Sequence, residues 1–253
     1  MLMQPTIEML NAMRLGGMVT ELEAQMERPD VASLPFEDRF GLIVDREWRQ
    51  REERRTNKRL KAAHFKVSAC LEDVDYRHRR GLDKTVLLDL GTCRWVAAKR
   101  NVIITGATGL GKTWLACAIA DRACRQGFTC EYKRVPRLVE ELAMSRADGS
   151  HLKFLARLAH IDLLVLDDWG LSPLTGQAQH DMLEVVDDRN GNRSTLLTSQ
   201  LPISKWHDMV GDPSVADALL DRLLQASTQI VLKKAESLRK ETPANDNPAP
   251  KAD

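Results

Sequence analysis

The sequence predicts an α/β fold with a five-stranded parallel sheet, preceded by a small all-helical domain. Residues 106–113 read GATGLGKT and fit the pattern G-x-x-x-x-G-K-[ST], between a β-branched run and an amphipathic run. A second apolar run ends in Asp167 and Asp168. Helical patterns separate the apolar runs, which favours parallel pairing through right-handed crossovers. The predicted strands are residues 101–105, 129–133, 161–168, 194–199 and 228–232.

Length and composition limit the function classes. A chain of 253 residues with net charge +1 accommodates one α/β domain and a small appendage. The five cysteines form no C-x-x-C pair and lie in apolar contexts, which argues against a disulfide framework or a zinc site and favours a reducing cytoplasm. No apolar run approaches the ~20 residues that span a bilayer, so we expect no membrane association and a cytoplasmic location.

The first 66 residues are predicted to form the helical domain. Apolar residues recur at helical spacing over residues 5–27, and the pair Gly16-Gly17 divides this stretch into two short helices that end at Pro29. A longer helix is predicted from about residue 35 to 63, with proline in its first turn. Its expected buried face consists of Phe36, Phe40, Ile43, Val44 and Trp48.

The second half of that helix gathers the positive charge of the chain. Residues 46–66 carry nine Lys and Arg against three Glu, whereas residues 1–45 carry three Arg against eight acids. One interpretation is a contact with nucleic-acid phosphates. The other is an exposed helix face whose arginines pair with Glu47, Glu52 and Glu53. The residues assigned to DNA under the first interpretation are Arg51, Arg54, Arg55, Lys58 and Arg59.

Residues 67–100 are predicted to connect the two domains. A linker over residues 71–83 leads into a helix of about residues 84–98, which is polar enough to lie on the surface. Such a linker could lie along a nucleotide base, and an ordinary interdomain connection would have the same sequence character.

The Gly-rich segment is predicted to bind nucleotide phosphates. Its glycines let backbone N–H groups curl around phosphate oxygens at a helix N-terminus, where the helix dipole favours anions. Lys112 would reach the β- and γ-phosphates, and Thr113 would ligate Mg²⁺, so ATP and Mg²⁺ are the expected ligands. The assigned cofactor-binding residues are Gly106, Ala107, Thr108, Gly109, Leu110, Gly111, Lys112, Thr113 and Trp114.

The acids after the third strand complete the predicted site. Two helices, at about residues 135–144 and 152–160, precede the apolar run that ends in Asp167 and Asp168. We assign Asp167 to the hydrated Mg²⁺ and Asp168 to orienting or deprotonating the attacking water. Acids after a strand also form turns, but this pair follows both an apolar strand and a phosphate loop.

The rest of the chain alternates helices and strands. A helix over residues 175–190 leads to the fourth strand, at whose end Ser199 or Thr198 would face the γ-phosphate. Helices follow at about residues 202–210 and 215–226, before the last strand. The ATPase core therefore covers residues 101–240, and the proline-rich tail, residues 241–253, is predicted to be disordered.

Together these motifs resemble the helper ATPases of insertion-sequence transposition, the IstB-like branch of the AAA+ superfamily, which is related to the helicase loader DnaC. The resemblance covers nearly the whole chain. It depends on GATGLGKT at 106–113, LDDWG at 166–170, LTSQLP at 197–202, GDP at 211–213 with ADALLDRL at 216–223, and ESLRK at 236–240.

The resemblance implies an AAA+ core and further site residues. Arg222 would be an arginine finger that reaches a neighbouring subunit, Arg239 a sensor of the γ-phosphate in the same subunit, and Ser199 the first sensor. Asp168 stands where many AAA+ proteins have Glu, one methylene longer, which implies slow turnover. About twenty residues follow the last strand, which leaves no room for the usual C-terminal helical lid.

The implied function is an ATP-driven switch that assembles into a ring or spiral on duplex DNA and presents that DNA to a cognate transposase. A helicase loader would use the same ATP chemistry with a replicative helicase as its partner. A small-molecule kinase is a third alternative. The pair Asp167-Asp168 favours hydrolysis over that alternative, as does the lack of an Arg-rich lid segment between the strands.

Overall fold

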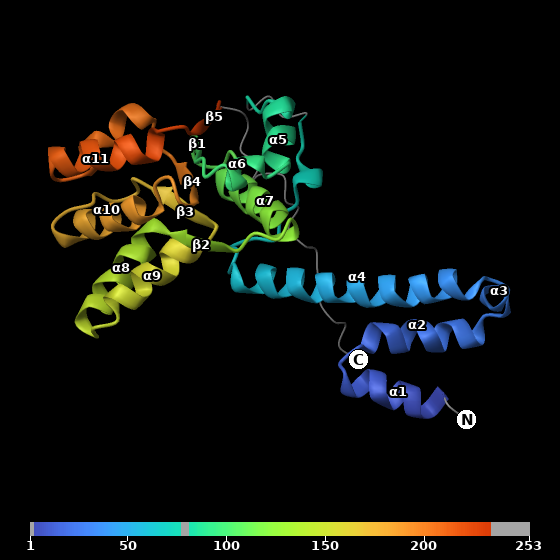
Figure 1. Ribbon diagram of the computed structural model, residues 1–253. Helices are drawn as coiled ribbons and strands as arrows, with labels where there is room; N and C mark the ends of the chain where they lie inside the picture. Colours follow the sequence, from blue (N-terminus) through green and yellow to red (C-terminus); the bar gives the residue numbers. More distant parts are fainter. Residues whose placement is uncertain (1–2, 77–80, 234–253) are drawn as a thin grey trace, which may run out of the picture. The chain divides into compact units, whose positions relative to one another are not determined.

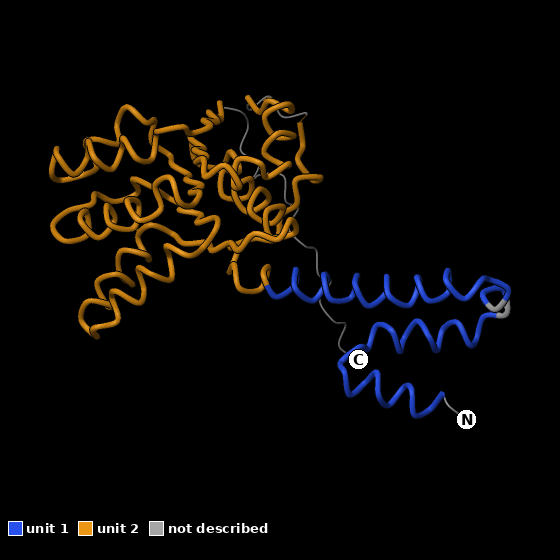
Figure 2. Tube along the Cα trace, in the orientation of Figure 1, with its two compact units in different colours: residues 1–58 blue, residues 59–253 orange. Residues whose placement is uncertain are grey.

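The computed structural model describes residues 3–76 and 81–233 (Figure 1). Arg239 and the predicted disordered tail lie outside these residues. The chain divides into two compact units, Met1–Lys58 and Arg59–Asp253 (Figure 2). Within the described ranges, no helix is both long enough and apolar enough to cross a bilayer.

The N-terminal unit is helical, as predicted. It contains α1 (Met3–Ala12), α2 (Gly16–Glu27), α3 (Pro29–Ala32) and most of α4 (Phe36–Ala62). Gly16 and Gly17 begin α2, which confirms that this pair separates two short helices. The Glu47 carboxylate on α4 accepts hydrogen bonds from the backbone N–H groups of Gly17, at 2.7 Å, and Met18, at 3.3 Å. A Cβ at Gly17 would lie 2.7 Å from the Cα of Glu47, so this close approach of α2 and α4 requires glycine.

The predicted buried face of α4 is wrong. The side chains of Phe36, Phe40, Val44 and Trp48 are exposed, and Ile43 is only partly buried. The buried residue that α4 contributes is instead Glu47, which binds the first turn of α2. Helical spacing correctly placed the apolar residues on one face, but spacing does not reveal whether another element covers that face.

The second unit contains the predicted five-stranded parallel sheet. Its spatial order is β2-β3-β4-β1-β5, and every neighbouring pair is parallel. The strands are β1 (Val102–Gly106), β2 (Cys130–Arg134), β3 (Leu163–Trp169), β4 (Ser194–Ser199) and β5 (Thr228–Leu232).

Helices cover both faces of this sheet (Figure 1). Alternate side chains of β3 serve the two cores: Leu163 and Val165 pack on one side, and Leu164 and Leu166 pack on the other. The first core includes α5 (Lys84–Gly91), α6 (Arg94–Ala97) and α7 (Lys112–Arg125). The second includes α8 (Val135–Ala147), α9 (His151–His160), α10 (Gln177–Arg189) and α11 (Pro213–Leu224).

Two predicted helices differ in the structure. The expected surface helix over residues 84–98 is divided into α5 and α6 at Cys93, whose φ is +54°. One side of it lies on the surface, with Leu88 exposed, while Leu87, Leu90 and Trp95 are buried in the core that contains α7. Its polar residues therefore occupy only the outer side of a half-buried element.

The expected helix over residues 202–210 consists of two short 3₁₀ turns, Ile203–Lys205 and His207–Met209. Trp206, between them, is fully buried, and its indole N–H donates to the carbonyl oxygen of Leu201 at 3.1 Å. Seating this large side chain in the core overrides the local helical preference.

Arg189 at the end of α10 holds together the segments at the amino-terminal ends of β3 and β4. Its buried guanidinium donates to the carbonyl oxygens of Leu158, at 2.5 Å, and Ile161, at 2.9 Å, and also to that of Ser194. These bonds connect the end of α9, the entry to β3 and the start of β4. A charge this deeply buried is stable only when such acceptors replace water.

Candidate nucleotide site

The Gly-rich loop joins the end of β1 to the start of α7. Gly106 has φ +151°, and a Cβ there would lie 2.7 Å from the carbonyl oxygen of Leu232, so this position requires glycine. Gly111 is left-handed, with φ +81°, and no side chain caps the helix. The first intrahelical bond runs from Leu115 N to Gly111 O, so the earlier N–H groups have no acceptor within α7. This geometry fits phosphate oxygens.

Lys112 lies against the same loop. Its side chain is largely buried, and its Nζ donates to the carbonyl oxygens of Gly106, at 2.7 Å, and Ala107, at 2.9 Å. The hydroxyl of Thr108 donates to the side-chain carbonyl of Gln200 at 2.7 Å, which connects the loop to the residue after β4. The loop therefore presents a fixed positive charge next to the backbone N–H groups.

Asp167 is fully buried among hydroxyl groups. The hydroxyl oxygen of Thr113 lies 2.9 Å and 3.0 Å from its two carboxylate oxygens. The hydroxyls of Tyr132 and Thr198 donate to it at 2.6 Å and 2.5 Å. Burial and the adjacent Asp167 carboxylate raise the pKa of Tyr132, which stays a neutral donor. The structure thus brings together the two predicted metal-binding residues, Thr113 and Asp167, and their hard oxygen atoms are ligands that Mg²⁺ accepts.

β3 contains a bulge at Asp167 and Asp168. Leu166 pairs with Leu197 of β4, and the next pairing is Trp169 with Ser199, so two acids face the single residue Thr198. Asp168 has φ +64°, and its N–H donates to the Thr198 hydroxyl at 3.2 Å. Bulges of this kind redirect a side chain at the edge of a sheet.

The carboxylate of Asp168 is held by an arginine from the neighbouring strand. Arg134, the last residue of β2, places both its Nε and an Nη atom 2.9 Å from Asp168 Oδ2. The Asp168 side chain remains 17 % exposed, so this acid lies beside solvent while Asp167 lies beneath it. The two acids therefore differ in their surroundings, and their assignment to metal binding for Asp167 and water activation for Asp168 stays a prediction.

The end of β4 separates the two candidate sensors. Thr198 contacts both acids, whereas the Ser199 hydroxyl donates to the carbonyl oxygen of Trp169 at 2.7 Å and accepts from Leu201 N at 3.1 Å. Successive side chains on a strand point to opposite faces, so only one of the pair can face the acids. The structure does not bring Ser199 to them, and its sensor role stays a prediction.

Arg222 lies on α11, and its side chain contacts residues of α10 and α11. It pairs with Asp187 on α10 and donates to the carbonyl oxygen of Ala218 at 2.8 Å. The structure does not bring it to the phosphate loop of its own subunit. Its role in a neighbouring site therefore stays a prediction, as does that of Arg239.

Three residues of this site were missed by the sequence analysis: Tyr132, Arg134 and Gln200. The carboxyl ends of parallel strands meet at one edge, and Arg134 ends β2 while Gln200 follows β4, so strand position was a usable signal for both. No sequence signal pointed to Tyr132, because the orientation of its ring depends on packing.

Comparison with known proteins agrees with this geometry. A family model described as IstB-like ATP binding protein matches residues 8–245. The chain belongs to this family. An insertion sequence ATP-binding protein of Sinorhizobium fredii is 45% identical to this IstB-like chain over 240 residues, which cover 95% of the chain and 98% of the relative. A second relative, from an insertion sequence of Pseudomonas fluorescens, is 48% identical over 205 residues, 81% of the chain and 89% of the relative.

Solved structures support the fold of this IstB-like chain. The crystal structure of the DnaC helicase loader superposes with a TM-score of 0.54 at 19% identity and covers 65% of the chain and 97% of the loader. The IstB-like chain therefore has the α/β AAA+ P-loop fold, and its family is one of ATP-binding proteins associated with insertion sequences.

Proposed function

We propose that this protein is an ATP-dependent DNA-binding helper of transposition. It assembles as a ring or spiral on duplex DNA and recruits or stimulates a cognate transposase through ATP binding and hydrolysis. The proposal depends on one observation: Lys112, Thr113, Asp167 and Asp168 lie together at one edge of the sheet. The insertion-sequence names of the relatives support the choice of partner.

Each residue of the constellation has a distinct chemical task. The N–H groups at the start of α7 and the Lys112 ammonium hold the phosphates. Thr113 and Asp167 hold Mg²⁺, which, when bound, neutralises charge on the β- and γ-phosphate oxygens. Asp168, held at 2.9 Å by Arg134, orients the attacking water and accepts its proton.

Replacing Asp168 with Asn should leave ATP binding intact and lower hydrolysis by about 10²–10⁴-fold, the usual contribution of a general base. Asparagine also tolerates a left-handed backbone, so the change removes the charge and keeps the bulge. Phosphate release and binding of a fluorescent ATP analogue measure the two effects. Asp121→Asn, on α7 and paired with Arg125, is the control, and unchanged hydrolysis in Asp168→Asn would refute the assignment.

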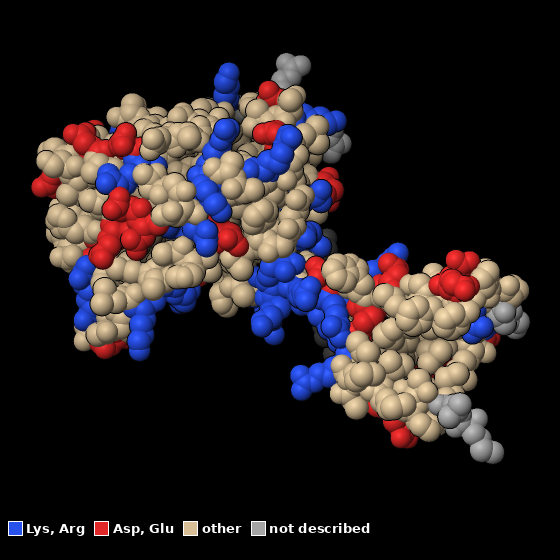
Figure 3. Space-filling view, viewed as in Figure 1, with Lys and Arg blue, Asp and Glu red and all other residues tan. Residues whose placement is uncertain are grey.

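The basic part of α4 supports DNA binding in only some of its residues. Figure 3 shows Lys and Arg side chains gathered along this helix. Arg51 pairs with Glu47 and Arg55 pairs with Glu52, each at 2.6 Å, as the alternative interpretation expected. Arg59 donates to the carbonyl oxygen of Cys124 at 2.9 Å. Arg54 and Lys58 are exposed one helical turn apart, and no ion pair engages either within the described residues.

Arg54→Ala and Lys58→Ala should each flatten the slope of log K against log salt by about 0.9 on duplex DNA, equally for unrelated sequences, because each removes one phosphate contact. Fluorescence anisotropy at several salt concentrations measures the slope. Arg49→Ala is the matched control, since Arg49 lies on the same helix but pairs with Asp45 at 2.8 Å. If the double variant Arg54/Lys58→Ala retains the original slope, the DNA contact lies elsewhere.

The proposal as a whole can be tested against the helicase-loader alternative. Electron microscopy of the protein with ATP and duplex DNA should show ordered assemblies on the DNA. In a strand-transfer assay, the transposase encoded with the same element should be stimulated by the wild type and not by Lys112→Ala. Loading of a replicative helicase onto single strands without any effect on the transposase would favour the alternative, for which the fold likeness to DnaC is the present support.

A further inference from the structure

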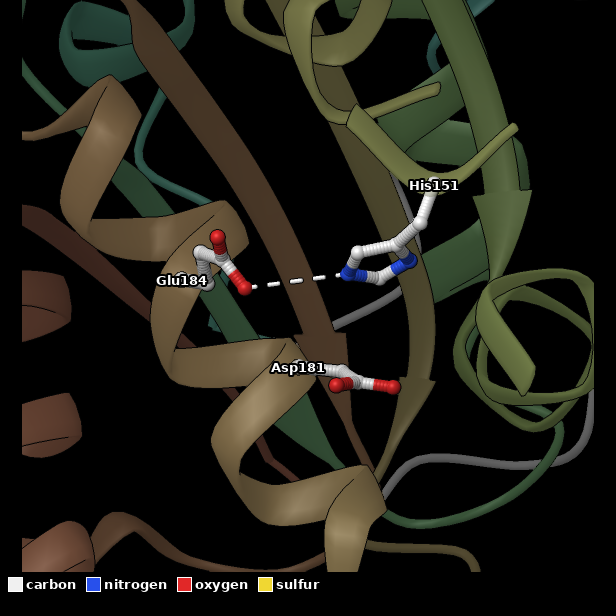
Figure 4. A group of neighbouring side chains, drawn as sticks. All are labelled: His151, Asp181 and Glu184. Atoms are coloured by element: carbon white, nitrogen blue, oxygen red, sulfur yellow. Dashed lines mark ion pairs between the residues drawn. The ribbon is translucent and has the colours of Figure 1, made fainter. Parts of the chain in front are cut away.

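A second cluster of polar side chains lies where the α8–α9 turn meets α10. It consists of His151 at the start of α9 and of Asp181 and Glu184 on α10, whose side chains converge in Figure 4. One ligand atom from each residue lies within 4.8 Å of the others. None of the three belongs to the nucleotide constellation, and the proposed ATP chemistry does not use them.

Hydrogen bonding fixes the tautomer of His151. The Ser145 hydroxyl donates its proton to the carbonyl oxygen of Leu142 at 2.7 Å, so its oxygen is an acceptor for the His151 Nδ1, 2.9 Å away. Nδ1 therefore carries the hydrogen of the neutral ring, and the lone pair is on Nε2. The His151 side chain is 11 % exposed, and its Nε2 is buried without a hydrogen-bond partner within the described residues.

This lone pair faces negative charge. The His151 Nε2 lies 3.7 Å from a carboxylate oxygen of Glu184, so two acceptors face each other (Figure 4). A buried acceptor left in this way is costly unless a cation or a donor lies between the two groups. The second carboxylate, Asp181, is nearly fully buried and lies one helical turn away on the same face of α10.

Within the described residues, the hydrogen bonds and the ion pair of the buried Asp181 carboxylate all involve one of its two oxygens. Arg146 donates to Oδ1 through Nε at 2.8 Å and lies at 2.5 Å through Nη2, and Gln177 also donates to Oδ1 at 2.9 Å. These bonds all end on the same oxygen, which leaves Oδ2 for another ligand. One guanidinium opposes two carboxylates, so the cluster retains a net negative charge.

We propose that His151, Asp181 and Glu184 bind one divalent transition-metal ion of the Zn²⁺ class. The ligands are His151 Nε2, Asp181 Oδ2 and one oxygen of Glu184, and water completes four-coordination. An imidazole nitrogen with two carboxylates favours zinc over Mg²⁺, which requires oxygen ligands in octahedral geometry. Ser145 and Arg146 serve as the outer partners that orient His151 and Asp181.

The site needs only a small adjustment to close around the ion. Bonds of about 2.0–2.2 Å draw the three ligand atoms closer together than they now lie. Glu184 has a side chain that is 44 % exposed, so it can swing toward the two buried ligands. The bound ion fastens the α8–α9 turn to α10 and should stabilise this part of the core.

The test is a calorimetric titration of untagged, chelator-treated full-length protein with ZnCl₂ in buffer that contains excess Mg²⁺. The wild type should bind one equivalent, and His151→Gln and Glu184→Gln should each weaken the affinity at least tenfold. Zn²⁺ should also raise the melting temperature of the wild type and not that of Glu184→Gln. His207→Gln is the matched control, because His207 lies 3.4 Å from Asp217 in an exposed pair that has no third ligand among the described residues.

Titration with Co²⁺ gives an independent measurement, since the visible absorption of four-coordinate Co²⁺ should be lost in His151→Gln. ATP binding by the variants confirms that they are folded. The proposal is overturned if the wild type shows no saturable Zn²⁺ binding, or if either His151→Gln or Glu184→Gln binds Zn²⁺ as the wild type does.

Discussion

ATP binding should be abolished by Lys112→Ala. The Lys112 ammonium is the buried positive charge of the phosphate loop, fixed by the carbonyl oxygens of Gly106 and Ala107. Removing one partner of a buried charge pair costs about 2–5 kcal/mol. Each 1.4 kcal/mol is a factor of ten, so the affinity should fall at least about thirtyfold. Titration with a fluorescent ATP analogue measures this loss.

The control for this change is Lys153→Ala, at an exposed position on α9. The carbonyl oxygens that Lys112 now binds would lose a donor, so the melting temperature of the variant should be recorded beside its affinity. A folded Lys112→Ala protein that binds ATP as tightly as the wild type would contradict the phosphate-binding assignment.

Arg222→Ala should lower ATP turnover by about 10³–10⁵-fold and leave ATP binding unchanged, because an arginine finger acts on the transition state of a neighbouring site. In its own subunit Arg222 contacts Asp187 and Ala218, and neither belongs to the phosphate loop. Asp187→Asn is the matched control, since it breaks the same ion pair and retains the arginine. The variant Asp187→Asn should keep near-normal turnover.

Mixing shows whether Arg222 acts between subunits. The Arg222→Ala subunit retains a complete phosphate loop, and the Lys112→Ala subunit retains the arginine, so a mixed assembly contains some intact sites. Activity should reappear when the two inactive proteins are combined and should peak at an intermediate ratio. If no ratio restores turnover, Arg222 does not complete a neighbouring site.

The strands β1 and β3 were predictable because each is largely an apolar run covered on both faces, whereas β2 and β5 at the edges mix polar and apolar residues. Leu163 and Leu164 pack into the cores on opposite faces of the sheet. A segment that is apolar at every position is typical of a strand buried on both faces. The burial of the helices was harder to predict, because the elements that pack against a helix decide which of its sides is buried. Trp48 and Trp95 illustrate this: the first was expected to be buried and is exposed, and the second was expected in a surface helix and is buried.

The chemistry of the site was predictable to the level of motifs. The loop at 106–113 and the pair Asp167-Asp168 lie at one sheet edge, as their positions after strands imply. The sequence could not decide whether Thr198 or Ser199 faces the two acids, because this depends on the register between β3 and β4 and on the bulge that shifts it. The Arg134 contact depends on the strand order, which places β2 beside β3.

The left-handed backbone of Asp168 also restricts which acids can evolve at this position. Aspartate and asparagine adopt this conformation readily, whereas a longer side chain costs about 1–2 kcal/mol there. Glutamate would gain one methylene of reach but would have to strain the turn or straighten the bulge opposite Thr198. The identity of the acid and the path of the strand are therefore coupled: an exchange of Asp for Glu either strains the backbone at this position or changes the register of β3.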